Sequence, residues 1–426
     1  MDLVKHRKNL LAIFDKALQA VNGRTCVRDY LLEHPVVCQP QSLYLVAIGK
    51  AANAMTFGAC EIIPTQIKRA LVITKAGYGD ASLFKSLPVT WRESAHPVPD
   101  QRSLEAGAVL LSFIRDAPPD AHFLFLISGG ASSLVEVLPD GMTLAALEEV
   151  NEWLLASGLD IHHINCVRKA MSCIKGGRLA MDLAGRTADV LLISDVPGNV
   201  LANIGSGLLV TDDQNAPCVS DIDIPPQIRA LIKTASAAPP ANHPCFARIK
   251  THIIASNEVA RHAAESHAKE LGYTVHRHAG IITGDTIEVA HAQARMLKEG
   301  VPGIYIGGGE TTILLPPQPG RGGRNQSLAL AVAQEIAGCG NIVFLAAGTD
   351  GSDGPTHDAG AIVDGATITR GIAHGIQRGQ NECGDDAASY LMRADAGSFL
   401  AASGDLITTG PTGTNVMDLL LGLKTA

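Results

Sequence analysis

Short, fully apolar runs recur along the chain, and a glycine-rich or polar turn follows most of them. The runs lie at 43–48, 70–74, 123–127, 190–193, 253–255, 304–306 and 342–346. Stretches with helical periodicity separate most of the runs, at 101–116, 143–156, 161–183, 225–237, 257–271, 284–299 and 325–337. A strand that is apolar at every position is buried on both faces, as in a parallel sheet covered by helices. The pattern therefore predicts an α/β fold with mainly parallel sheets flanked by helices.

A break in this periodicity divides the chain. Between residues 212 and 250, the segments DDQNAPC and SAAPPANHPC interrupt the alternation of strands and helices with Pro, Asn and Ala. We therefore expect two α/β domains, residues 1–240 and 241–426, a domain count that suits a chain of 426 residues. A helix expected at 415–422 is a candidate for a return to the first domain.

Polar residues collect where the expected strands end, which is the edge of an open α/β sheet at which ligands bind. The positions are Gly49-Lys50, Ser128-Gly129-Gly130, Ser194-Asp195, Gly307 to Thr312, Thr349-Asp350 with Asp353, and the glycine-rich loops GRGGRNQ (320–326) and TGPTGTN (409–415). A tight turn explains one such loop. Seven loops that mix Lys, Arg, Asp, Ser and Thr indicate a site for phosphate or another anion.

Three charged residues at these strand ends are candidates for catalysis. Lys50 opens a helix after a buried strand, where the alternative to a phosphate contact is an ordinary solvated lysine. Arg324 carries a planar fork of N–H donors that suits phosphate or carboxylate. Asp195 is suited to binding Mg²⁺ or accepting a proton, and its structural alternative is the capping of a turn.

Two aspartates in the segment GTDGSDG have a similar pair of interpretations. Asp350 and Asp353 lie beside glycines, as the oxygen ligands of a hard cation such as Mg²⁺ often do. The same residues are also common in turns, where the carboxylate accepts hydrogen bonds from the nearby backbone. His96, in SAHPVPD, is expected to form a structured turn, with contact to a substrate as the alternative.

Composition and charge narrow the classes of function. With 46% hydrophobic and 18% charged residues, the chain is not expected to be intrinsically disordered. The net charge of −8 and the absence of long like-charged runs disfavour binding to nucleic acid or to a membrane surface. The N-terminal residues are expected to form an amphipathic helix rather than a signal peptide. Nine scattered cysteines without a CxxC pair suggest reduced thiols in a cytoplasmic protein.

Several common catalytic motifs do not occur in the sequence. The chain lacks GxxxxGK[ST], which disfavours a P-loop kinase, and GxGxxG, which disfavours a conventional nicotinamide-binding fold. It also lacks HExxH and the GxSxG turn of serine hydrolases. We therefore expect a different loop system to hold phosphate.

Taken together and in their order, the motifs resemble those of the glycerate 2-kinases whose C-terminal part is a MOFRL domain. The matching segments are AIGKAA (47–52), HPVPD (96–100), SGGASSL (128–134), INCVRKAMSCIKGGRLA (164–180), LLISDVPGN (191–199), GGGETT (307–312), GRGGRNQSLALA (320–331), GTDGSDGPTHDAGAIVD (348–364) and TGPTGTNVMDL (409–419). The resemblance implies the phosphorylation of D-glycerate to 2-phosphoglycerate with ATP and Mg²⁺. It also implies a Rossmann-like first domain, a MOFRL-type second domain and an active site in the cleft between them.

By motif position, the resemblance implies catalytic roles for Lys50, Asp195 and Arg324. Phosphoryl transfer mainly requires positioning and the neutralisation of charge, which Lys50 and Arg324 could supply. Asp195 could hold Mg²⁺ or take the proton of the substrate hydroxyl. Expected substrate and phosphate contacts are Ser128, Gly129, Gly130, Arg168, Gly308, Glu310, Thr311, Asn325, Thr412 and Asn415, and expected metal contacts are Asp195, Asp350 and Asp353. The carboxylate of glycerate is assigned to Arg168 or to the loop Ser128-Gly129-Gly130.

The chain departs from the family pattern near the expected site. Asn199 stands where an Asp is expected, Leu208 and Leu209 replace a Pro-Thr pair, and Ala170 stands where a His is common. These departures leave another small hydroxy acid open as the acceptor. Two other classes also stay open, a hydroxypyruvate reductase and a metabolite-binding regulator without catalysis. We expect ATP and D-glycerate as partners, no nucleic acid or membrane, and a monomer or homodimer.

Overall fold

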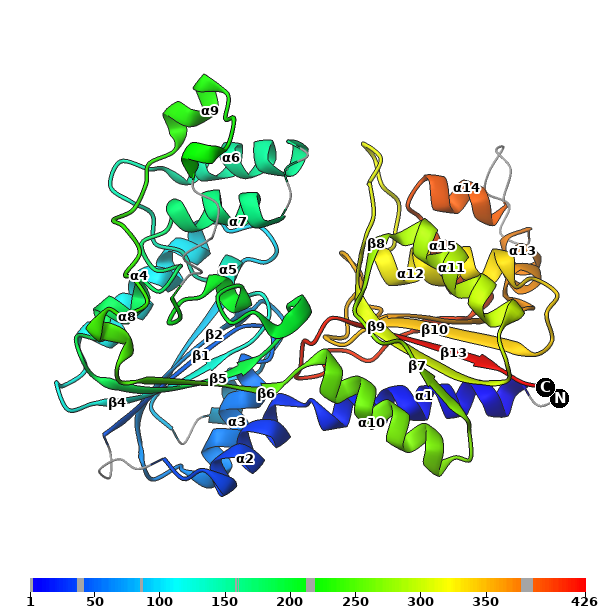
Figure 1. The fold of residues 1–426 in the computed structure, drawn as a ribbon, viewed down its shortest axis with the longest axis horizontal. Coiled ribbons are helices and arrows are strands. Elements are labelled where there is room, and N and C mark those ends of the chain that lie inside the picture. The colour runs from blue at the N-terminus through cyan, green and yellow to red at the C-terminus, as the bar shows by residue number, and fades with distance from the viewer. Residues whose placement is uncertain are drawn as a thin grey trace. The chain divides into compact units, whose positions relative to one another are not determined.

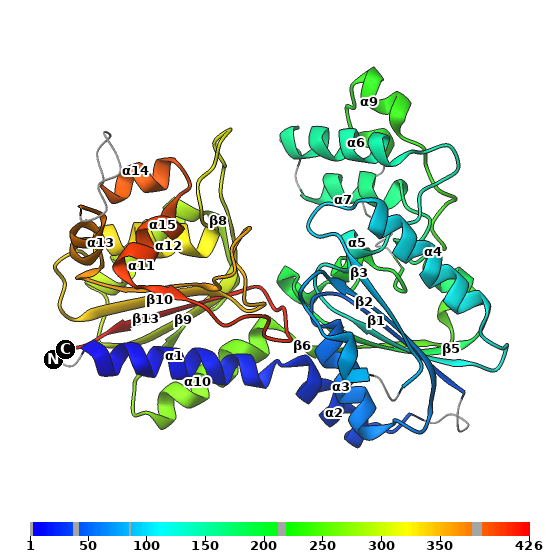
Figure 2. The ribbon, with the colours of Figure 1, turned by 180° about the vertical axis from the view of Figure 1, so that it is seen from behind.

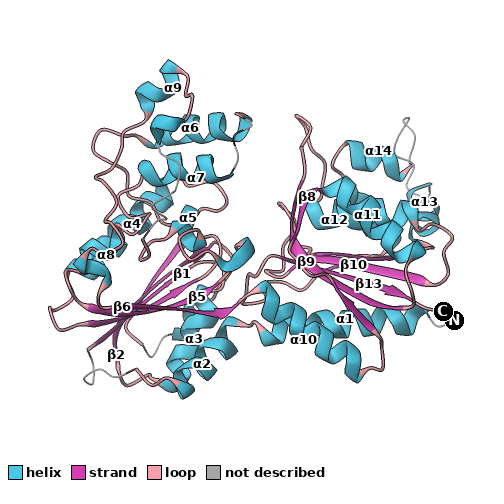
Figure 3. Ribbon diagram, in the orientation of Figure 1, coloured by secondary structure: helices cyan, strands magenta, loops and turns pink. Residues whose placement is uncertain are grey.

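The computed structural model describes residues 3–36, 42–84, 87–157, 159, 161–211, 219–376 and 386–426. The chain forms two compact units. Residues 23–254 form what we call the first unit, and residues 1–22 together with 255–426 form the second unit. Each unit combines a β-sheet with helices (Figure 3).

The division between the units differs from the boundary expected at residue 240. It falls after β6 (Ile249–Ala255), because this strand joins the sheet of the first unit. The first 22 residues belong with the C-terminal part of the chain. Residues 212–218, in the expected connection, lie outside the described part of the chain.

The sheet of the first unit has six strands in the order β3-β2-β1-β4-β5-β6. The five before β6 are β1 (Leu43–Ile48), β2 (Ile67–Lys75), β3 (Val89–Ser94), β4 (His122–Ile127) and β5 (Thr187–Ile193). All recorded pairings among β1 to β5 are parallel. This is the strand order of Rossmann folds, so the Rossmann-like arrangement expected for the first domain is confirmed. Every residue of β1 is buried, as its fully apolar sequence predicts.

Helices cover this sheet on both faces. The helices of this unit are α2 (Gly23–Glu33), α3 (Ala52–Ile62), α4 (Gln101–Arg115), α5 (Ala131–Leu134), α6 (Leu144–Ala156), α7 (Ile161–Ala170), α8 (Leu179–Asp182) and α9 (Pro226–Leu231). Figure 1 shows α2 and α3 on one side of the sheet and α4 on the other. Helices α6, α7 and α9 pack around a small apolar core of their own, which includes Leu147, Val150, Val167 and Ile228.

The sheet of the second unit is mixed. Its strands are β7 (Val275–Arg277), β8 (Ile282–Asp285), β9 (Gly303–Thr312), β10 (Ile342–Gly348), β11 (Gly360–Asp364), β12 (Leu406–Ile407) and β13 (Asp418–Lys424). They run in the order β12-β11-β10-β13-β9-β7, with β8 beside β9. Only β7 and β8 pair parallel to β9, and the other recorded pairings are antiparallel. The mainly parallel arrangement predicted for both sheets is therefore wrong for this one. A fully apolar strand indicates only that both of its faces are buried. In this sheet helices bury antiparallel strands as well, so the apolar pattern does not distinguish parallel from antiparallel pairing.

The helix expected at 415–422 is a strand. Residues Asp418–Lys424 form β13, which pairs with β10 on one side and β9 on the other, inside the second unit. Its first six residues are all buried, and the run DLLLGLK has no polar face of the kind an amphipathic helix presents to water. The expected return of this segment to the first domain therefore does not occur.

The helices of the second unit form two layers. Helix α1 (Leu3–Ala20) and α10 (Asn257–Glu270) lie on one face of the sheet. The other face carries helices from the middle and end of the chain: α11 (Thr286–Glu299), α12 (Arg324–Glu335), α13 (Thr367–Ile376), α14 (Ala387–Met392) and α15 (Ala396–Ser403). Figure 2 shows the same two layers from behind.

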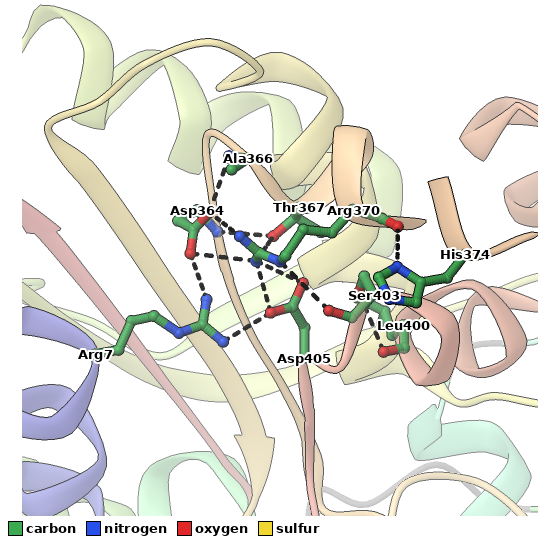
Figure 4. A network of polar contacts seen from close by, with 9 residues as sticks. All are labelled: Arg7, Asp364, Ala366, Thr367, Arg370, His374, Leu400, Ser403 and Asp405. Carbon is green, nitrogen blue, oxygen red and sulfur yellow. Dashed lines mark hydrogen bonds and ion pairs between the residues drawn. The ribbon is translucent and has the colours of Figure 1, made fainter. Parts of the chain in front are cut away.

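A network of charged side chains fastens α1 to this sheet (Figure 4). Arg7 donates from Nη1 to Asp364 Oδ2 over 2.6 Å and from Nη2 to Asp405 Oδ1 over 2.7 Å. Arg370 binds the same two carboxylates, at 2.9 Å from Asp364 Oδ1 and 2.8 Å from Asp405 Oδ1. Both aspartates are almost fully buried, so two guanidinium groups compensate the charge of two carboxylates that have lost their contact with water.

Replacing Arg7 with methionine should destabilise the protein by about 2–4 kcal/mol, because it leaves two buried carboxylates with a single cation. Chemical denaturation of the full chain measures the change. Lys8→Met, at the neighbouring exposed position of the same helix, is the matched control. Equal stability of the two variants would show that the network does not hold α1.

Candidate functional site

In the first unit, two loops meet where the strand order changes direction. Strands β1 and β4 are neighbours, and the strand order reverses between them. Rossmann folds bind their ligands at this reversal, outside the carboxyl ends of the strands. Lys50 follows β1, and Ser128-Gly129-Gly130 follow β4. The structure thus brings four of the predicted residues to this reversal of the strand order.

The two loops are joined by hydrogen bonds. The backbone N–H of Lys50 donates to the carbonyl of Gly129 over 2.9 Å. The N–H of Ala51 donates to Oγ of Ser128 over 3.0 Å. This approach requires the glycine at position 49, because a Cβ there would lie 2.1 Å from Ser128 Oγ, and its φ is +132°. Lys50 is therefore fixed at its backbone to the loop that follows β4.

His96 also belongs to this place, although the sequence favoured a structural turn for it. A Cβ added at Gly130 would lie 2.8 Å from His96 Cδ2 and 3.5 Å from Lys50 Cγ. The three residues are therefore neighbours, and a side chain at position 130 would collide with the imidazole. The alternative interpretation of His96, contact with a substrate, gains support from this position.

Asp195 lies at the same edge of the sheet, because it follows β5, and β5 pairs in parallel with β4. Asn199, in the turn beyond it, has a φ of +55°, a conformation that Asn tolerates better than most residues. Leu208 and Leu209 are buried in the core of the unit. Leu208 and Leu209, which depart from the family pattern, thus contribute to the packing of this core.

Arg168 is a partly buried cation on α7. Its Nε donates to Oδ1 of Asn151 on α6 over 2.9 Å. Among the described residues it forms no ion pair, and burial lowers the pKa of its guanidinium. Four of its five N–H donors are not used in the Asn151 bond.

In the second unit, a group of acidic side chains surrounds Arg324, the first residue of α12. The ladder places Asp418, at the start of β13, opposite Gly309 of β9 and Gly348 of β10. Arg324 donates from Nη1 to Glu310, and its Nη2 lies 3.6 Å from Asp418 Oδ2. Glu310 and Arg324, which are both predicted site residues, thus lie beside each other.

Asp353 caps α12 from a distance. Its carboxylate accepts hydrogen bonds from the backbone N–H of Asn325 over 3.1 Å and of Gln326 over 2.7 Å. Gly323, the residue before the helix, allows this approach, since a Cβ there would lie 2.3 Å from the Asp353 carboxyl. Two N–H groups that could have bound phosphate at this helix start are therefore occupied. The predicted contact of Asn325 with substrate or phosphate therefore cannot use its backbone N–H in this arrangement, and it stays a prediction for the side chain.

The metal contacts predicted from sequence receive no support from this geometry. Oδ1 of Asp350 accepts from the N–H of Ser352 over 2.9 Å and from its hydroxyl over 3.1 Å, which is the turn interaction considered as the alternative. Both oxygens of Asp353 serve the helix cap. Within the described ranges, no three His, Cys, Asp or Glu residues are grouped as metal ligands. Metal binding by Asp195, Asp350 and Asp353 stays a prediction.

The segment Gly307 to Thr312 is part of strand β9 and not a loop after it. Its glycines allow close packing, since a Cβ at Gly308 would lie 2.3 Å from Asn257 Oδ1. Thr311 is buried, and its hydroxyl accepts from Thr286 Oγ1 over 3.0 Å. The loop expected here is therefore wrong, and Gly308 and Thr311 have structural partners.

The glycine-rich loop 409–415 folds back on the end of β10. The Thr412 hydroxyl donates to the carbonyl of Thr349 over 2.5 Å. The backbone carbonyl of Thr412 accepts from Asn22 Nδ2 over 2.9 Å. Asn415 is largely buried. Both residues lie near the start of β13, beside the group around Arg324, but their predicted contact with a ligand stays a prediction.

Comparison with known proteins identifies the family. The profile described as "Domain of unknown function (DUF4147)" matches residues 9–231, and that of the MOFRL family matches residues 303–418. A D-glycerate 2-kinase of Thermotoga maritima is 32% identical over 431 residues, which cover 98% of this chain and 98% of that protein. The chain belongs to the glycerate 2-kinase family.

A solved structure of the glycerate 2-kinase family confirms the fold. The crystal structure of a glycerate kinase from Thermotoga maritima matches with a TM-score of 0.81 at 32% identity, over 99% of this chain and 100% of that one. One relative, from Agrobacterium vitis, is named a hydroxypyruvate reductase; it is 32% identical over 98% of this chain and 94% of its own length. The matches to the MOFRL family and to the Thermotoga maritima proteins confirm the family resemblance inferred from the motifs.

Burial changes the acidity of two carboxyl groups beside Arg324. It raises the pKa of Asp418 to about 7, although the guanidinium of Arg324 opposes the rise. It raises the pKa of Asp353 to about 6, against the hydrogen bonds from Gln326 and Asn325. Burial also acts on Arg324, but the carboxylates of Asp418 and Glu310 outweigh it and raise the pKa of the guanidinium. In this member of the glycerate 2-kinase family, Asp418 therefore titrates near neutral pH.

Replacing Asp418 with asparagine should change how stability depends on pH. The pKa of Asp418 in the folded protein is about 7, above the ordinary value. The carboxyl group is therefore protonated at pH 4, and the stability that this proton contributes is lost as pH rises through 7. Asparagine does not titrate. We expect the free energy of unfolding of the variant to exceed that of wild type by about 2–4 kcal/mol at pH 8 and by little at pH 4. Denaturation across this pH range measures the difference, and parallel curves would contradict it.

Sequence reasoning missed Asp418. It lies within the helix predicted at 415–422, and its apolar neighbours give no signal for a charged site. Reading β13 as a strand would have placed Asp418 at the same edge as the end of β9, and hence beside Glu310.

Proposed function

We propose that the protein transfers the γ-phosphoryl group of ATP to the 2-hydroxyl of D-glycerate, giving ADP and 2-phosphoglycerate. The contact between the Lys50 loop and the Ser128-Gly129-Gly130 loop at the reversal of a Rossmann-ordered sheet is the observation that carries the proposal. Similarity over nearly the whole length to proteins named glycerate 2-kinase supports it.

In the proposed reaction, Lys50 and Arg324 neutralise charge that develops on the transferred phosphoryl group. Asp195, at the same sheet edge as Lys50, accepts the proton of the acceptor hydroxyl. The placement of the active site in a cleft between the domains stays a prediction.

Mg²⁺ is proposed as the counter-ion of ATP. Magnesium is usually held by one or two carboxylates together with the phosphates of the substrate. Asp353 does not fit as a ligand, since both its oxygens accept backbone N–H groups, and Oδ1 of Asp350 is engaged by Ser352. We therefore assign no step of the reaction to a protein-bound metal.

Arg168 is proposed to bind the carboxylate of the acceptor. Replacing it with glutamine should raise KM for D-glycerate by about 10- to 100-fold, because a hydrogen bond between two charged groups is worth ~1.5–3 kcal/mol. KM for ATP should change little. Initial rates against both substrates measure the effect. Arg115→Gln, at a surface ion pair of the same unit, is the control. An unchanged KM for D-glycerate would remove Arg168 from the acceptor site.

One experiment separates the candidate functions. ADP release is followed over a panel of small hydroxy acids, and NADH depletion is followed in parallel with hydroxypyruvate. The proposal predicts ADP release with D-glycerate. Another preferred acid would change the acceptor, NADH oxidation without ATP would indicate a reductase, and no turnover with retained ligand binding would indicate a regulator.

We also propose a cytoplasmic location. The six cysteines within the described residues are all free thiols. Burial raises the pKa of Cys26 to about 11 and that of Cys60 to about 12, which makes these thiols poorly reactive. No helix in the described residues has the length and hydrophobicity to cross a membrane. Whether the protein is a monomer or a homodimer stays a prediction.

A further inference from the structure

A buried ion pair lies in the first unit, between Lys175 and Glu136. Lys175 Nζ is 2.5 Å from Glu136 Oε2, and the two side chains are 5% and 2% exposed. The second oxygen of Glu136 accepts from the N–H of Val137 over 3.0 Å. Apolar residues of similar volume could fill the same space without removing two charges from water. The pair therefore calls for an explanation other than stability.

The pair connects two segments that are far apart in the sequence. Glu136 follows α5, the short helix that begins directly after Gly130. Lys175 lies in the turn 173–177 beyond α7, and Cys173 in this turn donates from its N–H to the carbonyl of Val137 over 2.8 Å. The turn is thus attached to the far end of the segment that begins with the Ser128-Gly129-Gly130 loop.

The same turn also holds the segment that follows β5. Gly176 donates to the carbonyl of Ser206 over 3.0 Å, and Gly177 to that of Gly207 over 2.6 Å. Gly205 lies just before these acceptors with a φ of +55°. A Cβ there would lie 3.2 Å from Ile127 Cγ2 and 3.3 Å from Ala131 Cβ.

Ile127 and Ala131 border the Ser128-Gly129-Gly130 loop on its two sides. The turn carrying Lys175 therefore reaches this loop by two routes, one through Glu136 and α5 and the other through Gly205. The loop in turn receives the N–H groups of Lys50 and Ala51.

We propose that Glu136 and Lys175 are a positioning pair that fixes the Ser128-Gly129-Gly130 loop, and with it Lys50, for phosphoryl transfer. This inference rests on the proposed function. Neither residue touches a substrate in this account. The pair acts by setting the place of the loop, and a misplacement of about 1 Å at such a site can lower the rate by about 10²-fold.

The test is the double substitution Lys175→Met with Glu136→Leu in the full chain. Because an apolar pair can replace a buried ion pair without loss of stability, the variant should keep wild-type stability. We expect kcat to fall by about tenfold or more, with KM for D-glycerate within about threefold of wild type. The matched control replaces a more exposed ion pair of the same unit, Arg115→Met with Asp182→Leu, and should keep wild-type kcat.

A second readout does not depend on activity. The amides of Lys50 and Ala51 donate to the loop, so their hydrogen exchange should become about tenfold faster in the double variant, whereas the amides of β1 keep wild-type protection. A folded double variant with wild-type kcat and wild-type exchange at these amides would overturn the proposal.

If the double variant does not fold, Lys175→Arg with Glu136→Asp decides the question. This variant keeps the charges but changes the lengths of both side chains, and we again expect a lower kcat and faster exchange at Lys50 and Ala51. Wild-type values of both would contradict the positioning role. Absence of ATP-dependent turnover in the wild-type protein would instead refute the proposed function, while the exchange comparison still tests the pair.

Discussion

Replacing Lys50 with alanine is expected to lower kcat by about 10²- to 10³-fold, since the loss of one preorganised charged contact to a transition state costs this much. The backbone of Lys50 bonds to Gly129, and its side chain starts beside Gly130 and His96. The hydrogen bonds that place the loop are donated by the backbone N–H groups of Lys50 and Ala51, so they do not depend on the lysine side chain. Activity should therefore fall while the fold is retained.

Steady-state kinetics with ATP and D-glycerate measure this loss, and circular dichroism verifies the fold. Lys68→Ala is the matched control, because Lys68 is exposed near the start of the neighbouring strand β2, away from the carboxyl ends of the strands. A Lys50→Ala enzyme that turns over within about threefold of wild type would exclude a catalytic role for the lysine.

Replacing Arg324 with lysine should lower kcat by about 10²-fold or more, although the charge is kept. Arg324 binds Glu310 and lies near Asp418, so its planar guanidinium is oriented by two carboxylates on different strands. An ammonium group has no such fork and cannot bind two acidic groups and a phosphoryl oxygen in the same geometry. Arg324→Ala should be at least as impaired.

The control is Arg321→Lys, three residues earlier in the same glycine-rich loop. Arg321 forms its ion pair with Asp358 over 2.6 Å and is about half exposed. We expect its substitution to leave kcat within about threefold, because lysine keeps the positive charge that faces the buried carboxylate of Asp358. Equal losses for the two arginines would indicate that the loop as a whole, rather than Arg324, is required.

The fold of the first unit could be predicted because its signals are local. Each strand is an apolar run, and each polar turn after a strand lies at the carboxyl edge of a parallel sheet. Lys50 and the Ser128-Gly129-Gly130 loop could be placed together on this basis alone. The hydrogen bond between Lys50 and Gly129 confirms their proximity.

The second unit was harder to predict because the structure of its first and last segments depends on contacts with residues far away in the sequence. A run such as DLLLGLK is apolar in either a strand or a buried helix, and only its pairing with β9 and β10 decides for the strand. The amphipathic character of residues 3–20 was readable, but the ion pairs of Arg7 join residues more than 350 positions apart. No local pattern reports such contacts.

Acidic residues beside glycines were the least predictable part of the site. Asp353 follows a glycine-rich turn in the way a metal ligand would, yet it caps α12, which begins 29 positions earlier in the chain with Arg324. The cap is needed because the residue before this helix, Gly323, has no side chain to accept the N–H groups. Which role an aspartate has depends on a tertiary contact that its neighbours in sequence do not encode.

The proposed reaction transfers the γ-phosphoryl group of ATP to the 2-hydroxyl of D-glycerate. Phosphorus NMR of the reaction of the purified protein with ATP, Mg²⁺ and D-glycerate tests it most directly, because it distinguishes 2-phosphoglycerate from 3-phosphoglycerate and from free phosphate. We expect 2-phosphoglycerate and ADP to form in equal amounts and Lys50→Ala to suppress both. Formation of 3-phosphoglycerate, or of free phosphate with no phosphorylated acid, would contradict it.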